Sequence, residues 1–212
     1  NSGFVGSDYA EHLTICFVHD TPGTKLYLTA SDVDKWGVPM AEIVETARSN
    51  FEKLKSDFRS AFKDGRVFRS FADDTYDATR LLLPAPCFEQ LPVRGTHVAM
   101  VPHPNILLIT GDQDPEGLHI ILEDAKRWLK DPSAINAFMY RRTETGWEPW
   151  NPELQPADRV EYEGLVRDTL ARDYARQQRL QETLRQKSPE DYHPFAASYI
   201  KFPPGRSDAL QT

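Results

Sequence analysis

The feature that most constrains this chain is a long charged stretch at residues 158–187. It contains seven basic and six acidic side chains, and its few large apolar residues recur at helical spacing. These apolar residues are Val160, Leu165, Val166, Leu170, Tyr174, Leu180 and Leu184. At roughly 1.5 Å per residue the stretch forms a helix about 45 Å long, which exceeds the width of a small domain. The chain is therefore expected to fold as a domain with a helix appended to it.

The boundary between these two parts is marked by three prolines between positions 149 and 156. We expect an α+β domain over residues 1–150. Residues 151–212 are expected to hold a proline-rich linker, a long charged amphipathic helix and an extended C-terminal strap. The strap, at residues 192–204, is rich in aromatic side chains and is expected to cover apolar surface. A length of 212 residues with 40% hydrophobic content suits one domain and an appended segment.

Apolar periodicity predicts the elements of the domain. Strands are predicted at residues 13–18, 25–29 and 66–72, and hairpins at residues 97–110 and 137–150. Helices are predicted at residues 36–58 and 115–130, with Trp36 and Trp128 in the core. Because hairpins with short turns dominate the connections, the strands are expected to form a mostly antiparallel sheet with helices packed on one face.

The charge and the cysteines bear on partners and location. The formal charge is −7, from 25 basic and 32 acidic side chains, so we expect no nucleic acid and no anionic membrane as partner. No apolar run approaches the roughly 20 residues that span a bilayer, and no signal peptide pattern opens the chain. Cys16 and Cys87 do not make a disulfide framework, which favours a reducing, cytoplasmic location. Cys16 lies in an apolar strand and is expected to be buried.

Motifs for the common catalytic chemistries are absent from the sequence. It contains no glycine-rich phosphate loop, no dinucleotide fingerprint, no nucleophile elbow and no Cys-x-x-Cys pair. The six histidines form neither a His-Glu-x-x-His motif nor a pair four residues apart, so no metal site can be drawn. We therefore expect neither a metal nor a cofactor. Whether the chain is an enzyme is left open, although the missing motifs weigh against it.

An acidic run after the third predicted strand is the main chemical candidate. The carboxylates of Asp73, Asp74 and Asp77 can ligate Mg²⁺ or share a proton, and the Arg80 guanidinium can hold a phosphate or carboxylate. Alternatively, Asp74 and Asp77 cap a helical turn at residues 75–83. In that interpretation Arg80 pairs with Asp77 or Asp73.

His103 is a second candidate, at the tip of the hairpin at residues 97–110 between Pro102 and Pro104. The ordinary pKa of a histidine lies near neutrality, which suits a general base. A histidine in a turn also has a purely structural use, because its ring can bond to the turn's own backbone. Both interpretations remain open.

Three segments in the same order resemble the YtpQ-like bacterial family, a domain family of unknown function. One is the predicted helix with Trp36, Ile43, Ala47, Asn50 and Phe51, and the others are residues 69–82 and residues 98–108. The resemblance covers roughly residues 10–150. Phe51 stands where the family usually has Leu, and Thr75 where it tends to have Gly. The family also carries a preceding β-β-α segment that this chain lacks, and the helix and strap after residue 150 are additional.

The resemblance implies the α+β fold but no activity or substrate. It places Tyr76, Asp77, Arg80 and His103 in the family's pattern. The candidate binding corner is therefore Asp73, Asp74, Tyr76, Asp77, Arg80 and His103. No catalytic residue is identified within it.

Three functions fit the sequence. The first is a binding or adaptor domain that engages a protein partner or a second copy through residues 151–212. The second is a metal-dependent hydrolase or small-molecule-processing enzyme that uses Asp73, Asp74, Asp77, Arg80 and His103. The third is a toxin-neutralising or secretion-chaperone protein, a class to which an acidic, compact α+β chain is suited.

Overall fold

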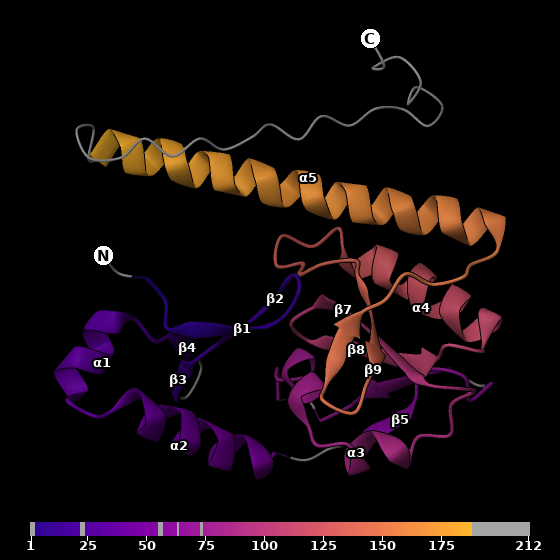
Figure 1. Ribbon diagram of the computed structural model, residues 1–212, viewed down its shortest axis with the longest axis horizontal. Helices are drawn as coiled ribbons and strands as arrows, with labels where there is room; N and C mark the ends of the chain where they lie inside the picture. The colour runs from indigo at the N-terminus through magenta and orange to yellow at the C-terminus, as the bar shows by residue number, and fades with distance from the viewer. Residues whose placement is uncertain (1–2, 22–23, 55–56, 63, 73, 188–212) are drawn as a thin grey trace. The chain divides into compact units, whose positions relative to one another are not determined.

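A computed structural model describes residues 3–21, 24–54, 57–62, 64–72 and 74–187 (Figure 1). The chain divides into two units, Asn1–Pro152 and Glu153–Thr212. In the described part of the first unit, strands form three antiparallel sheets and are accompanied by helices, which confirms the α+β fold. Among the described residues, no helix has the length and apolar character needed to cross a membrane.

The largest sheet has six strands in the order β10-β9-β7-β8-β6-β5, all antiparallel. The strands are β5 (Phe58–Ser60), β6 (Phe68–Ser70), β7 (His97–His103), β8 (Ile106–Gly111), β9 (Met139–Arg142) and β10 (Trp147–Pro149). The hairpins predicted at residues 97–110 and 137–150 are β7–β8 and β9–β10. Every residue of β8 is buried, because β8 has a strand on each side and cover on both faces.

One face of this sheet is covered by α4 (Pro115–Trp128), which lies along β7 and β8 (Figure 1). Asp114 is the N-cap of this helix, and its side chain accepts a hydrogen bond from the Gly117 N–H at 3.1 Å. Gly117 packs closely on the sheet, since a Cβ there would lie 2.1 Å from Thr110 Oγ1. Thr110 pairs with Val98 of β7, so this face carries Thr110, Val98 and, two residues further, Met100. The predicted helix at residues 115–130 is confirmed.

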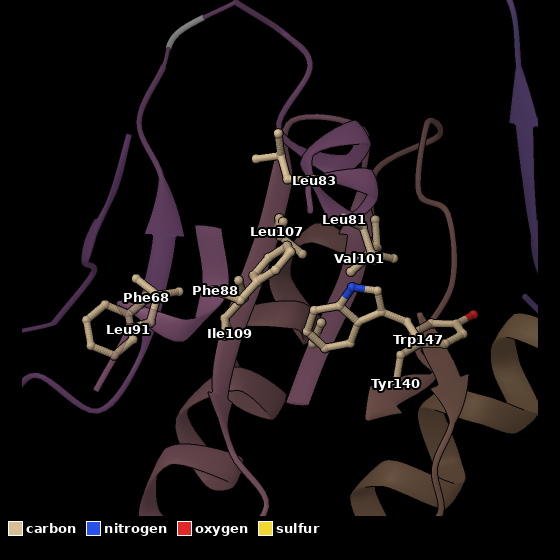
Figure 2. Packing of buried hydrophobic residues seen from close by; sticks show 11 residues of the cluster. Phe68, Leu81, Leu83, Phe88, Leu91, Val101, Leu107, Ile109, Tyr140 and Trp147 are labelled. Carbon is tan, nitrogen blue, oxygen red and sulfur yellow. The ribbon is translucent and has the colours of Figure 1, made fainter. Parts of the chain in front are cut away.

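The opposite face carries a hydrophobic cluster, shown in Figure 2. It is completed by the 3₁₀-helix η1 (Ala78–Leu82) and the short helix α3 (Pro86–Glu89). Its buried members are Phe68, Leu81, Leu83, Phe88, Leu91, Ala99, Val101, Leu107, Ile109, Tyr140 and Trp147. Phe88 meets Trp147 edge to face at 5.2 Å between ring centroids. Burial of side chains of this size contributes about 1.5–3 kcal/mol each, so the cluster is a main source of stability for the sheet.

The N-terminal region, residues 3–54, contains two small hairpins and two helices. The elements are β1 (Gly6–Ala10), β2 (Leu13–Cys16), β3 (Val18–Thr21), β4 (Thr24–Tyr27), α1 (Ala30–Trp36) and α2 (Met40–Glu52). The capping box at the start of α1 pairs the Thr29 side chain with the Asp32 N–H, and Asp32 in turn accepts from the Thr29 N–H. The sequence pattern missed β1, because this strand contains few apolar residues.

The single helix predicted at residues 36–58 is wrong. Helix α1 ends at Trp36, and Gly37 adopts a left-handed φ of 65° that terminates it. Pro39 then precedes α2, and a proline disfavours helical conformation in the residue before it. The chain therefore breaks between Trp36 and Met40, and α2 ends at Glu52.

Three side chains lie elsewhere than expected. Trp36 is 48% exposed and Cys16 is exposed, whereas both were predicted to be buried. Trp128 is half-buried. The side chain of Phe51, near the end of α2, packs against the cluster of Figure 2. That cluster lies on the sheet face opposite α4.

The second unit contains α5 (Pro156–Lys187), so the predicted long helix is confirmed (Figure 1). From Arg176 onward most of its side chains are exposed, as its thin apolar stripe predicts. The predicted strap at residues 192–204 lies outside the described residues. Docking of the helix by its apolar stripe stays a prediction.

Candidate functional site

The predicted corner is organised around Arg80, which η1 places in the interior. Its side chain is fully buried, and its Nη1 donates to Asp74 Oδ1 at 2.8 Å while its Nη2 donates to Asp74 Oδ2 at 2.5 Å. This bidentate pair satisfies a buried guanidinium in the geometry that a carboxylate matches best. The charge of Arg80 is therefore balanced by a carboxylate of the protein itself.

Asp74 also shapes the loop that leads to η1. Its Oδ1 accepts a hydrogen bond from the Tyr76 N–H at 3.0 Å, across Thr75, whose φ is 63°. A left-handed backbone is uncommon for a β-branched residue, so this side-chain bond helps to hold it. The hydrogen bonds from Arg80 hold the pKa of the Asp74 carboxyl below its usual value, although partial burial opposes them. Asp73 lies outside the described residues.

Asp77 does not cap the helical turn in the way the sequence predicts. It stands directly before η1 with helical backbone angles, and its side chain makes no capping hydrogen bond. It is 7% exposed, and its Oδ1 is buried without a hydrogen-bond partner, 3.9 Å from Arg80 Nη1. A buried carboxylate oxygen without a donor is costly, and the nearby Arg80 charge offsets part of that cost.

Two side chains of the β3–β4 hairpin join the corner, and the sequence had not indicated them. Lys25 Nζ lies 3.3 Å from the centroid of the Tyr76 ring and donates to the Thr75 carbonyl at 3.0 Å. The Tyr76 hydroxyl donates to Asp20 Oδ2 at 2.8 Å. Lys25 is 50 positions from Thr75 and Asp20 is 56 positions from Tyr76, so no local pattern signals these contacts.

Burial perturbs the two groups at this contact. It lowers the pKa of the Lys25 ammonium, against the opposing effect of Asp20, Asp74 and Asp77. Burial, together with the hydrogen bond to Asp20, raises the pKa of Tyr76 to about 12. The Tyr76 hydroxyl therefore keeps its proton at neutral pH, and Lys25 and Asp20 are both engaged with the loop before η1.

The side chain of His103 has different partners. Its Nδ1 accepts from the Asn105 N–H at 3.2 Å, its Nε2 lies 3.6 Å from Asp131 Oδ1, and its ring centroid lies 5.4 Å from that of Trp128. The backbones do meet, because the Ala78 N–H donates to the Pro104 carbonyl at 2.9 Å. The hairpin tip is thus next to η1, while the His103 ring is held by residues at the end of α4. A site shared by Asp77, Arg80 and His103 stays a prediction.

The described residues of the corner form no metal-binding cluster. No group of three His, Cys, Asp or Glu side chains suited to a metal occurs among the described residues. One open depression of about 520 Å³ is lined by Ala85, Phe88, Glu89, His97, Arg142, Thr143 and Glu144. Another, of about 480 Å³, follows residues 8–14. The described corner residues line neither of them, so the corner is an ion-paired junction between β3–β4, η1 and the preceding loop.

Comparisons with known proteins do not add to this picture. No family model, no curated protein and no solved structure matches the chain. The resemblance to the YtpQ-like family therefore stays a prediction, carried by the three segments quoted above. Function is argued below from the geometry alone.

Proposed function

We propose that the chain is a binding or adaptor domain that engages a protein partner, or a second copy of itself, through residues 151–212. The supporting observation is the surface of α5. Leu180 and Leu184, one helical turn apart, are 59% and 37% exposed, and Val160 is 61% exposed. A helix of 32 residues with little intrinsic apolar character gains stability mainly from contact by such residues. Leucines spaced by four positions present a surface on which another helix packs.

The pairing of the charged side chains in the corner favours a binding function over a catalytic one. A reaction centre needs charged groups within reach of a substrate, whereas Arg80 is fully buried and held by Asp74. Lys25 and Tyr76 are likewise engaged, with Thr75 and Asp20. These residues stabilise the fold, and the function is assigned to surfaces outside the corner.

A small-molecule-processing enzyme is the second candidate, and Asp77 is the observation that favours it. Its buried Oδ1 has no hydrogen-bond partner, which is typical of a group that awaits a proton or a cation. Calorimetric titration with Mg²⁺ and Mn²⁺ tests this candidate on the intact chain and on Asp77→Asn. Saturable heat that Asp77→Asn abolishes would support it, and the absence of heat would remove it.

Photo-crosslinking in cells tests the adaptor proposal. A benzoylphenylalanine introduced as Leu180→Bpa is expected to form an adduct with one defined protein or with a second copy. The matched control is Glu182→Bpa, which is exposed on the opposite side of the same helix. Equal labelling from both positions, or none from Leu180→Bpa, would contradict the proposal.

The setting that we propose is the cytoplasm of a bacterium. Two free cysteines, Cys16 and Cys87, support a reducing compartment. The formal charge of −7 supports a protein partner over nucleic acid.

A further inference from the structure

Arg69 in β6 is held differently from Arg59, its cross-strand neighbour in the large sheet. It pairs with Leu108 of β8 and with Arg59 of β5, so these three side chains share the sheet face that α4 covers. The Arg69 side chain reaches past the last turn of α4, where its Cζ lies 5.4 Å from the centroid of the Trp128 ring. It therefore stands at the margin of that face, half-buried, where a ligand from solvent can reach it.

Two aromatic rings hold the Arg69 guanidinium. Trp128 is one, and Phe71 is the other, with its centroid 5.7 Å from Cζ. Phe71 is 46% exposed, so the contact is open to solvent on that side. Aromatic rings attract a cation through their faces and leave the in-plane N–H groups of an arginine available for hydrogen bonds.

No anion compensates this charge in the described part of the chain. None of the Asp or Glu side chains described there lies within ion-pair distance of Arg69, and its Nε is buried without a hydrogen-bond partner. Asp73 lies outside the described residues. A buried N–H of a charged group without an acceptor is costly, so the Arg69 charge lacks compensation within the described residues.

The cross-strand neighbour Arg59 shows the contrast. It stands directly opposite Arg69 in the register of β5 and β6. The guanidinium of Arg59 is neutralised by Asp57, with Nε 2.8 Å from Oδ1. Arg69 has no such partner among the described residues, although its side chain is the more buried of the two. An anion bound at Arg69 would supply the partner that Arg59 already has.

We propose that Arg69 is the centre of a binding site for a phosphate group. Trp128 and Phe71 hold the guanidinium, and its terminal Nη–H groups donate to the phosphate oxygens. His103, which also contacts Trp128, lies at the border of the site with Asp131. The net charge of −7 disfavours a nucleic acid, so the phosphate belongs to a small molecule. This site uses no residue of α5, so either proposal can fail without the other.

The test follows the Arg69 Nε–H resonance of the full chain by NMR during titration with inorganic phosphate. A saturable shift of this resonance, absent with sodium chloride at matched ionic strength, is expected. Arg69→Lys keeps the charge but loses the planar edge, and is expected to weaken phosphate binding about tenfold or more. Arg48→Gln, an exposed α2 arginine that pairs with Glu45 and Glu52, is the matched control and leaves binding unchanged.

Two results would overturn the assignment. One is a shift that chloride reproduces or that Arg69→Lys does not weaken. The other is acetate binding as tightly as phosphate, which would make the site a carboxylate site. If Arg69→Lys fails to fold by its amide spectrum, Phe71→Ala replaces it. That variant removes an exposed ring and is expected to weaken phosphate binding severalfold.

Discussion

The strands of the large sheet are covered on both faces, whereas the N-terminal region, residues 3–54, leaves large apolar side chains in water. In β7 and β8 the residues that face α4 and those that face the cluster of Figure 2 are both buried. In the described N-terminal region the buried hydrophobic residues are Leu28 and Ile43. The exposed large hydrophobic residues there are Phe4, Leu26, Tyr27, Trp36 and Val44.

The difference arises from the number of neighbours that each strand has. A central strand such as β8 is hydrogen-bonded on both sides, and its side chains are enclosed by α4 and η1. The β3–β4 ribbon has two strands, and a ribbon of this size is marginally stable without cover. Helix α1 has no buried residue among those described. Amphipathic elements therefore form in both regions, but the large sheet alone provides a complete core.

The largest expected effect comes from Arg80, which belongs to the well-covered region. Arg80→Met removes the buried cation and leaves the Asp74 and Asp77 carboxylates without it, so we expect a loss of about 3–5 kcal/mol in the free energy of unfolding. Urea denaturation followed by circular dichroism measures it. The control is Arg48→Met on the exposed side of α2, with a change within about 0.5 kcal/mol. Equal effects of the two substitutions would break the comparison.

Substitutions that truncate an apolar side chain compare the two regions directly. Leu107→Ala in β8 is expected to lower the free energy of unfolding by about 2–5 kcal/mol, because Leu107 is fully buried in the cluster. Val44→Ala in α2, where the side chain is 43% exposed, is expected to cost less than about 0.5 kcal/mol. A thermal or urea melt of each variant checks the contrast. A Val44→Ala cost that approaches that of Leu107→Ala would show that α2 is buried in solution.

The pH dependence of the free energy of unfolding tests the role of Asp74 in the well-covered region. Because its pKa is lowered in the folded state, its carboxylate stabilises the protein above the unfolded pKa of about 3.9, and this stabilisation is lost as the pH falls through the folded pKa. Asp74→Asn is expected to cost about 2 kcal/mol at pH 7, a cost that shrinks below about pH 4. Urea melts from pH 7 to pH 2 measure it. A cost that is constant over this range would contradict the ion pair.

Thr75 gives an effect of opposite sign. Its left-handed φ of 63° strains a β-branched residue, and glycine adopts this conformation freely. Thr75→Gly is therefore expected to raise the free energy of unfolding by about 0.5–1 kcal/mol, after the greater entropy of glycine in the unfolded state is offset. The residue that the YtpQ-like pattern tends to have here is also Gly. Thr14→Gly, in β2, is the control and is expected to destabilise.

The smallest effect is expected at Trp36. Its ring is 48% exposed and meets His19 edge to face at 6.1 Å. Trp36→Ser is expected to change the free energy of unfolding by less than about 0.5 kcal/mol. The measurement is tryptophan fluorescence, where the emission lost with Trp36→Ser should be that of a solvent-exposed indole. Blue-shifted emission from Trp36 would mean that its surface is covered in solution.

The fold could be predicted where both periodicity and turn chemistry agreed. The β7–β8 and β9–β10 hairpins, α4 and α5 belong to this group. At residues 36–58 a helical period of apolar residues continued across Gly37 and Pro39, and the period outweighed the break that these residues signal. Burial could not be read from periodicity, because a regular apolar face such as that of Trp36 does not show whether another element covers it.

The residues of the corner could be predicted from the sequence, but the ion pairs and contacts between them could not. The cluster of Asp74, Asp77 and Arg80 was visible in the sequence, but which carboxylate holds Arg80 depends on the left-handed turn at Thr75. The contact of Lys25 with Tyr76 depends on the approach of two segments distant in the chain. The contact of His103 with Trp128 was also not predictable, because it depends on the position of α4 beside the strand that carries His103.

Native-state hydrogen exchange tests most directly whether the large sheet alone has a complete core. Amides within β7 and β8, such as those of Leu107 and Ile109, are expected to exchange only through global unfolding. Amides of the β3–β4 ribbon and of α1 are expected to exchange through local opening, at least about 100 times faster under the same conditions. Equal protection in the two regions, falling together with added urea, would contradict the account.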